Sequence, residues 1–339
     1  MEKKSKKVRE LLALAKGKKR ALIMPHNYAD PDAIAAALAM QSLLYEKVGL
    51  TGIISFNGVV GREENKVLCE ALSIEIVPTT QINFDDFDFI ILVDCQPGTG
   101  NNSLPKTIIA SAIIDHHPAD GILDGIPFID IRDNVGASST IATEYLIEAG
   151  AHISSDVATA LVYGIKSDAL NMAIKTKKKD IMAYLHLFPI ANLHILNNIE
   201  NAALPIEYFT TLNDAIESAG IYENVIVTDL KDVDNPGTIG ELADMFLRLS
   251  YVETSLCFGV YDETLMISIR TVNPKLNAGR IIRYAVGERG TAGGHASMAG
   301  GQIPLVKETQ KEKLEHINAV RSKVFDKLSI EGKRKKKLA

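Results

Sequence analysis

Short apolar runs alternate with amphipathic stretches through the first half of the chain, and this alternation restricts the fold more than any other feature. The strand-like runs are residues 21–24, 52–56, 89–93 and 111–114, and the helix-like stretches are residues 33–44, 63–72, 138–148 and 155–164. Strands that alternate with helices predict a largely parallel sheet wrapped by helices. The expected fold class of this half is therefore α/β.

The second half has a different pattern, which predicts a smaller mixed α/β domain. Residues 175–217 look helical, and strand-like and helical stretches alternate irregularly after them. We therefore expect an active-site cleft between two domains joined by a helical connector. The expected parts are a first domain (1–190), the connector (191–218), a second domain (219–330) and a basic disordered tail (331–339).

Composition narrows the class of partner. The net charge is -5, whereas a protein that grips long duplex DNA usually carries a broad basic excess, so short anionic substrates are favoured. Cys69, Cys95 and Cys257 are far apart, which predicts reduced thiols and a cytoplasmic location rather than a disulfide framework. No apolar run approaches the roughly 20 residues of a membrane span, so no membrane partner is expected. The sequence also lacks the P-loop pattern Gly-x-x-x-x-Gly-Lys-Ser/Thr, by which classical nucleotide triphosphatases bind phosphate.

Acidic and histidine residues follow three of the predicted strands at their carboxyl ends. They are His26, Asp30 and Asp32 after the first strand, Asp94 after residues 89–93, and Asp115, His116 and His117 after residues 111–114. In an open parallel sheet, ligands bind outside the carboxyl ends of the strands. Loops from separate strands should therefore bring these side chains together.

Such a cluster is typical of a divalent metal site. Carboxylates packed together raise one another's pKa, and a divalent cation removes that cost. Carboxylates with a few imidazoles suit Mn²⁺ or Mg²⁺, and the ligands outnumber what one ion with an open position needs. Two ions about 3.5–4 Å apart would use them, make hydroxide available near neutral pH and stabilise charge on a phosphoryl group.

Local patterns leave a plainer interpretation open for part of the cluster. Pro31 fits the first position of a helix, with Asp30 as its cap and Asp32 in its first turn. Asp30 and Asp32 could serve only these structural roles, and His26 alone could be an ordinary loop histidine. The common position of all three groups at strand ends favours the metal site.

With these residues in view, the chain resembles the DHH phosphoesterase superfamily. Four motifs occur in the family's order: His26-Asn27-Tyr28-Ala29-Asp30-Pro31-Asp32-Ala33, Val93-Asp94, Asp115-His116-His117 and Gly164-Ile165-Lys166-Ser167-Asp168. The family usually continues the fourth motif with threonine and glycine, where this chain has Ala169 and Leu170. The ligand position of this motif, Asp168, matches the family.

The resemblance implies roles for the clustered residues. It implies a pair of divalent cations, Mn²⁺ first and Mg²⁺ as the alternative, with Asp94 as the bridge. One ion would be held by His26, Asp30 and Asp94, and the other by Asp32, Asp94, His116 and Asp168. It further implies that His117 contacts the scissile phosphate or assists the leaving group, and that Asp115 orients the histidines.

The second half resembles the DHH-associated C-terminal domain. Its marker is Gly293-Gly294-His295 followed by Gly300-Gly301, in a glycine-rich stretch that could otherwise be a flexible hairpin. Glycine lets backbone amides approach an anion closely. The substrate-binding residues are therefore expected to be Gly293, Gly294, His295 and Arg270. Arg280 and Arg283 are interpreted as ordinary charges on a helix surface.

The leading hypothesis is hydrolysis of short oligoribonucleotides or of 3'-phosphoadenosine 5'-phosphate. Hydrolysis of inorganic pyrophosphate or polyphosphate is the alternative, although the serine-arginine-lysine motif of related pyrophosphatases is missing. A nucleotide-binding sensor without catalysis is a third class, which the apparently complete metal set disfavours. The sequence leaves the oligomeric state open, with a homodimer among the options.

Overall fold

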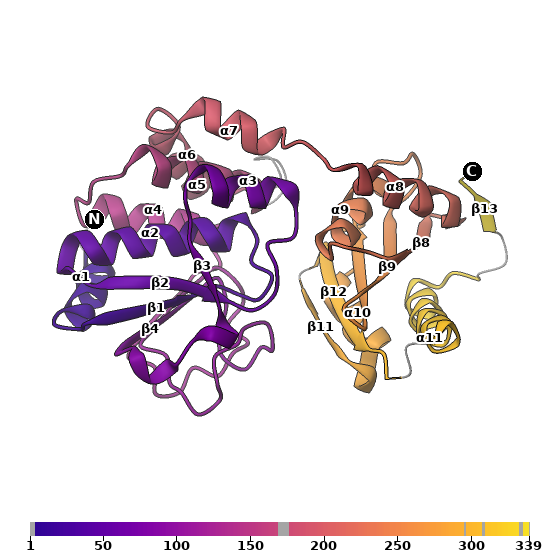
Figure 1. Cartoon of the computed structure of the whole chain (residues 1–339), viewed down its shortest axis with the longest axis horizontal. Coiled ribbons are helices and arrows are strands. Elements are labelled where there is room, and N and C mark those ends of the chain that lie inside the picture. Colours follow the sequence, from indigo (N-terminus) through magenta and orange to yellow (C-terminus); the bar gives the residue numbers. More distant parts are fainter. Residues whose placement is uncertain (1–3, 169–175, 295, 307–308, 332–334, 339) are drawn as a thin grey trace. The chain divides into compact units, whose positions relative to one another are not determined.

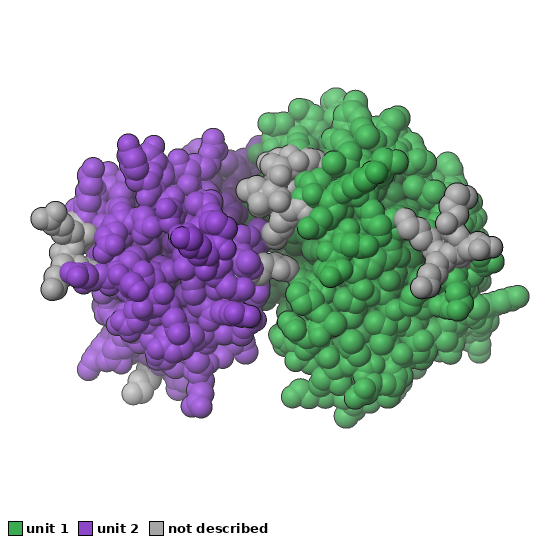
Figure 2. All heavy atoms as spheres, turned by 180° about the vertical axis from the view of Figure 1, so that it is seen from behind, with its two compact units in different colours: residues 1–202 green, residues 203–339 purple. Residues whose placement is uncertain are grey.

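The computed structural model describes the chain except for residues 1–3, 169–175, 295, 307–308, 332–334 and 339. The chain forms two compact units, residues 1–202 and 203–339 (Figure 2). This boundary divides the expected connector. Helix α7 (Leu193–Glu200) packs on α3 and α5 of the first unit, whereas α8 (Ile206–Ser218) packs on β8 of the second. Each half of the connector thus buries its apolar side in a different core.

The first unit is built on a parallel sheet with the strand order β3-β2-β1-β4-β5-β6 (Figure 1). Its strands are β1 (Arg20–Met24), β2 (Thr51–Phe56), β3 (Ile76–Pro78), β4 (Phe89–Val93), β5 (Ala112–Asp115) and β6 (Phe128–Ile131). Its helices are α1 (Lys4–Ala15), α2 (Pro31–Val48), α3 (Glu63–Ala71), α4 (Ser138–Glu148), α5 (Ser155–Asp168), α6 (Lys178–Leu187) and α7, with short 3-10 turns at Thr79–Gln81 and Phe84–Asp86.

The two faces of this sheet are covered differently. Ala21 and Ile23 of β1 point into a core that also contains apolar residues of all the helices from α1 to α7. Leu22 and Met24 point to the other face, where side chains from the 3-10 turns and the loops after β4 and β5 cover them. Alternate residues of a strand face opposite sides, so both faces are apolar. The helices therefore cover one face of the sheet rather than wrapping both.

The second unit contains a mixed sheet with the order β11-β12-β10-β9-β8-β7-β13, in which β8 and β9 are parallel and the other neighbours antiparallel. Helices α10 and α11 pack on one face, and α8 and α9 on the other. The strands are β7 (Gly220–Tyr222), β8 (Val225–Asp232), β9 (Thr254–Tyr261), β10 (Thr264–Thr271), β11 (Thr291–Gly294), β12 (Met298–Pro304) and β13 (Lys335–Lys337). The other helices are α9 (Gly237–Phe246), α10 (Ala278–Val286) and α11 (Gln310–Leu328), with a 3-10 turn at Gly287–Arg289.

The basic tail is not disordered throughout, contrary to the expectation for residues 331–339. Lys335–Lys337 forms β13 and pairs antiparallel with β7, which would otherwise be the edge strand of the second sheet. An edge strand offers unpaired backbone groups, and a lysine-rich partner can use them while its charges stay in solvent. Composition alone predicts the charge of this segment and misses the sheet edge that receives it.

None of the helices in the described part of the chain is both long and apolar enough to cross a membrane.

Candidate metal centre

The loop after β1 and the start of α2 supply the first acidic groups. Asp30 is the N-cap of α2, and its side chain accepts a hydrogen bond from the Ala33 backbone N–H at 3.0 Å. Pro31 occupies the first helical position, and Asp32 lies in the first turn. The expected helix start is therefore confirmed. Its capping geometry aims both carboxylates at the carboxyl ends of the strands.

Asp94 directly follows β4 and adopts an unusual backbone conformation. Its φ is +59°, in the left-handed region that most side chains avoid and that aspartate tolerates better than bulky residues. Its backbone N–H donates to the Ile114 carbonyl at 2.9 Å, which holds this conformation beside β5. Strained conformations of this kind cluster at functional sites. Here the turn places the Asp94 carboxylate, which is almost fully buried, within 3.6 Å of His26 and 3.3 Å of His116.

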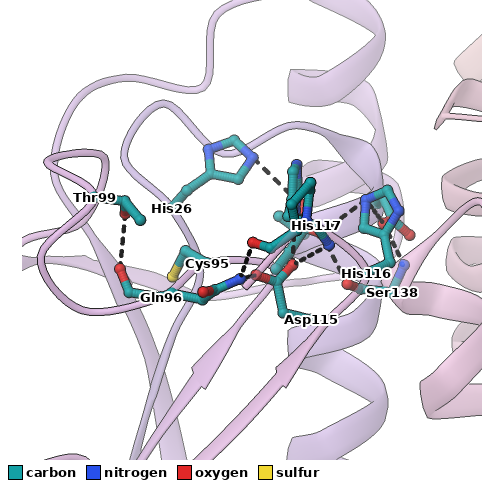
Figure 3. Close-up of polar contacts among 12 residues, drawn as sticks. His26, Cys95, Gln96, Thr99, Asp115, His116, His117 and Ser138 are labelled. Atoms are coloured by element: carbon teal, nitrogen blue, oxygen red, sulfur yellow. Dashed lines mark hydrogen bonds and ion pairs between the residues drawn. The ribbon is translucent and has the colours of Figure 1, made fainter. Parts of the chain in front are cut away.

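The predicted ligands gather around Asp94 and form three overlapping groups. The ligand atoms of each group lie within 4.8 Å of one another, and the groups are His26–Asp30–Asp94, Asp32–His116–Asp168 and Asp94–His116–His117. Figure 3 shows His26, His116 and His117 converging from loops at the strand ends. We use the term metal centre for His26, Asp30, Asp32, Asp94, His116 and Asp168.

Asp94 and His116 connect the groups. Asp94 Oδ2 lies 3.6 Å from His26 Nε2, and Asp94 Oδ1 lies 3.3 Å from His116 Nε2. His116 Nε2 is also 3.3 Å from Asp168 Oδ2 and 4.0 Å from Asp32 Oδ2. Each oxygen of Asp94 therefore faces a different cluster of donors, which is the arrangement a bridging carboxylate requires. The donor set of carboxylates and imidazoles fits two divalent cations.

Asp168 belongs to the last turn of α5, which continues four residues beyond the predicted 155–164. Gly164 lies one turn earlier, against α2. A Cβ atom at Gly164 would be 2.6 Å from Ser139 Oγ and 3.1 Å from Asp32 Cα. Glycine thus permits the close approach of α5 to α2 that brings Asp168 to Asp32 and His116.

Ser138 and Ser139 are site residues that the sequence pattern did not single out. The backbone N–H groups of Ser138 and Ser139 donate to Asp32 Oδ2 and Oδ1 at 2.7 and 2.8 Å. The Ser138 hydroxyl donates to Asp94 Oδ1 at 2.8 Å. The N-cap of α4 is Ala137, so these two serines lie inside the first turn of the helix. The amino end of α4 stabilises two buried carboxylates of the metal centre.

Gln96 is a second unforeseen residue, and it acts through Asp115. Gln96 Nε2 donates to Asp115 Oδ2 at 2.7 Å, and the Asp115 carboxylate is buried. Asp115 Oδ1 lies 2.7 Å from His117 Nδ1 and accepts a hydrogen bond from the His117 backbone N–H at 3.1 Å. These contacts fix the orientation of the His117 ring. A glutamine in an irregular loop has no sequence signal that would identify this role.

Neighbouring charges decide the protonation of these groups. Burial lowers the pKa of His26 and His116, but the adjoining carboxylates outweigh burial and raise each pKa to about 10. Burial raises the pKa of Asp32 well above its usual value, and the charges of Asp94 and Asp168 raise it further. Burial also works to raise the pKa of Asp94, but the histidines around it hold that pKa below its ordinary value.

Metal binding is therefore expected to release at least about two protons at pH 7, because His26 and His116 must lose theirs to act as ligands and the raised pKa of Asp32 adds to the release. The Mn²⁺ affinity should rise as the pH increases toward about 10. The stability of the metal-free protein should change with pH in the opposite direction. The imidazolium–carboxylate pairs stabilise the fold fully below 6.5, the ordinary pKa of histidine, and this stabilisation is lost as the pH rises through about 10. Calorimetric titrations in buffers of different ionisation heat measure the proton count.

A His26→Asn variant provides the control for this release. It should release about one proton fewer than the parent, because one of the two protonated imidazoles is removed. Binding heats that do not depend on the buffer would contradict the assignment of His26 and His116 as ligands.

The predicted substrate-binding residues belong to the second unit. Arg270 lies on β10, where its Nε donates to Asp244 Oδ1 at 2.6 Å and its Nη1 donates to Ser268 Oγ at 2.7 Å. Gly293 and Gly294 lie on β11, which pairs with β12 in an antiparallel hairpin, so the glycine run is regular there. His295 lies outside the described residues. Asp244 and Ser268 thus orient a guanidinium that was predicted to bind substrate.

Solved structures share this fold. An exopolyphosphatase-related protein from Bacteroides fragilis matches with a TM-score of 0.75 at 14% identity, over 95% of this chain and 97% of that one. RecJ from Thermus thermophilus, in complex with Mn²⁺, matches with a TM-score of 0.54 at 15% identity, over 96% of this chain and 55% of that one. At these identities the likeness establishes the fold alone.

Sequence comparison identifies relatives and both domains. The chain is 31% identical over 321 residues to an uncharacterized protein of Methanocaldococcus jannaschii, over 93% of this chain and 65% of that protein. It is 25% identical over 297 residues to the A-adding tRNA nucleotidyltransferase of Geobacter sulfurreducens, over 83% of this chain and 32% of that enzyme. The chain therefore spans less than two thirds of either relative. The model of the DHH family N-terminal domain matches residues 20–165 and that of the DHHA1 domain matches residues 223–326, so the chain belongs to the DHH phosphoesterase superfamily.

Proposed function

We propose that this protein hydrolyses phosphoester bonds of short oligoribonucleotides or of 3'-phosphoadenosine 5'-phosphate with the help of two divalent cations. The observation that carries the proposal is the sharing of Asp94 and His116 among three donor groups. Such sharing suits two adjacent ions better than one. Bound there, the cations would activate water and neutralise charge on the phosphoryl group.

The chain's own residues would hold and orient the reacting groups. His26, Asp30 and Asp94 would hold one cation. Asp32, Asp94, His116 and Asp168 would hold the other. Mn²⁺ is the first ion to test, because RecJ of similar fold was solved in complex with it.

His117 is suited to donate a proton. Burial lowers its pKa, but Asp94 and then Asp115 raise it above the ordinary value, which favours the imidazolium form. Because Asp115 engages Nδ1, proton donation would come from Nε2. The leaving oxygen of a phosphoester needs such a proton as its bond to phosphorus breaks. We therefore assign proton delivery to His117 and its orientation to Asp115 and Gln96.

A substrate panel with Mn²⁺ tests the proposal. It should contain ribo-oligonucleotides of two to about five residues, 3'-phosphoadenosine 5'-phosphate and inorganic pyrophosphate. We expect turnover of the nucleotides and much weaker turnover of pyrophosphate. Preferred hydrolysis of pyrophosphate would favour the alternative function. Binding of nucleotides without turnover of any substrate would favour a sensor.

Replacing Arg270 should affect substrate binding more than turnover. An arginine fork forms strong hydrogen bonds with phosphate oxygens, each contributing about 1.5–3 kcal/mol. The Arg270→Ala variant should therefore raise KM for the nucleotide about tenfold and change kcat less. Steady-state kinetics on one dinucleotide measures both. Arg283→Ala is the control, because Arg283 is an exposed charge on α10. A fall in kcat at unchanged KM would place Arg270 outside substrate binding.

A further inference from the structure

Tyr28 is an exposed aromatic residue in the loop that joins two ligands of the metal centre, His26 and Asp30. The loop runs from His26 to Asp30, whose side chains approach to 3.8 Å. Tyr28 lies two residues from each, so its Cα is within about 7 Å of both Cα atoms. The residue is 38% exposed. A solvent-accessible phenol ring is therefore attached directly beside the ligands.

Neighbouring loops hold the backbone of Tyr28 in an uncommon conformation. Its φ is +53°, in the left-handed region that bulky residues rarely adopt. The Tyr28 N–H donates to the Asn57 carbonyl at 2.9 Å, and the Asn27 N–H donates to the Asn101 carbonyl at 2.6 Å. Asn27 Oδ1 also accepts a hydrogen bond from Ser103 Oγ at 2.8 Å. Loops after β2 and β4 thus fix the position of Tyr28, as they would a functional side chain.

Gly58 supports one face of the Tyr28 ring. A Cβ atom at Gly58 would lie 2.7 Å from Cδ1, 2.7 Å from Cε1 and 2.8 Å from Cγ of Tyr28. Near-equal distances to three consecutive ring atoms place Gly58 over a face of the ring rather than at its edge. Only glycine leaves room for the ring there. The exposed area of Tyr28 therefore lies away from the face that Gly58 covers.

Other exposed aromatic side chains of the first unit lie elsewhere. In the described part of this unit they are Tyr45 and Phe188. Tyr45 lies near the far end of α2, about 20 Å from Asp32 at 1.5 Å per helical residue. Phe188 follows the last residue of α6. Tyr28 therefore stands out as the exposed ring in a loop of the metal centre.

We propose that Tyr28 is the platform on which a nucleobase of the substrate stacks while the adjoining phosphate occupies the metal centre. The inference rests on the proposed phosphoesterase function. A ring that is supported on one face and remains exposed elsewhere can stack any base, because every base presents a π-face. A base-free phosphate makes no such contact. Tyr28 would therefore select nucleotides over pyrophosphate without selecting among bases.

Tyr28→Leu and Tyr28→Phe test this assignment in the whole 339-residue chain loaded with Mn²⁺. The substrates are a ribodinucleotide and its abasic analogue, which has the same phosphodiester but no bases. Tyr28→Leu should raise KM for the dinucleotide about tenfold and leave KM for the abasic analogue unchanged. Tyr28→Phe keeps the ring face and should behave like the parent. Tyr45→Leu is the control, since it removes an exposed ring far from the metal centre.

A fluorescence titration with a dinucleotide that contains 2-aminopurine gives an independent readout. Stacking quenches this base, so the parent and Tyr28→Phe should quench it on binding in Mg²⁺, and Tyr28→Leu should not. Equal KM changes on both substrates, or unchanged quenching in Tyr28→Leu, would overturn the assignment. If the parent hydrolyses neither substrate, the proposed function fails, and the quenching still decides whether Tyr28 stacks the base.

Discussion

The Asp94→Asn variant is expected to lose about a thousandfold or more of the hydrolytic turnover and to bind one Mn²⁺ instead of two. Asp94 lies 3.6 Å from His26, 3.3 Å from His116 and 3.6 Å from His117, so it touches every histidine of the site. Asparagine keeps the size of the side chain and tolerates the left-handed backbone. It replaces one oxygen with an amide group that cannot bind a cation. The fold should therefore survive while the bridge is lost.

Calorimetric titration with Mn²⁺ and turnover of a dinucleotide measure the two effects, and thermal unfolding checks the fold. Asp88→Asn is the matched control, because Asp88 immediately precedes the strand that Asp94 follows. Its carboxylate accepts hydrogen bonds from the Lys19 and Arg20 backbone N–H groups at the opposite end of β4. Two bound Mn²⁺ ions in Asp94→Asn would remove Asp94 from the bridging position.

The Gly164→Val variant is expected to lower the free energy of unfolding by about 3 kcal/mol and to weaken Mn²⁺ binding at least tenfold. Replacing glycine inside a helix would by itself contribute a few tenths of a kcal/mol. At Gly164 the clash outweighs this gain, because a Cβ atom would lie 2.6 Å from Ser139 Oγ and 3.1 Å from Ala35 Cβ. Helices α2 and α5 must then separate. Asp168 on α5 moves away from Asp32 on α2 as they do.

Chemical denaturation and Mn²⁺ titration of the same samples test this coupling. Gly300→Val is the control, because a Cβ atom at Gly300 would make an ordinary contact, 3.4 Å from the Ile267 carbonyl oxygen. It should leave both quantities nearly unchanged. A Gly164→Val protein with normal Mn²⁺ affinity would show that the position of Asp168 does not depend on the packing of α2 and α5.

Sequence reasoning locates the parts of this site whose signals are local. A buried strand followed by an acid or a histidine can be recognised from a few residues, and His26, Asp94 and His116 were found in this way. The structure of the glycine-rich stretch and of the basic tail is harder to predict from the local sequence. The hairpin of β11 and β12 and the pairing of β13 depend on partners far along the chain, which composition does not indicate.

The groups that support the ligands are harder to predict. Ser138 donates to Asp94 across 44 positions of sequence, and its backbone reaches Asp32 across 106. Serine at a helix start has the same local signal whether it caps its own helix or serves a distant carboxylate. Asp168 was identified by family resemblance, because its helix continues beyond the apolar periodicity. Only tertiary packing distinguishes these cases.

The helices cover one face of the sheet in the first unit, so the two faces should tolerate sequence changes to different degrees. Helices α2, α4 and α5 carry or brace Asp32, Asp94 and Asp168, and they do so from a single side of the sheet. The opposite side is covered by irregular segments, and among these the 3-10 turns at Thr79–Gln81 and Phe84–Asp86 contain none of the site residues. Insertions and replacements in these turns would therefore leave the acid cluster in place. Relatives of this protein can differ there and still retain the same cluster of acids.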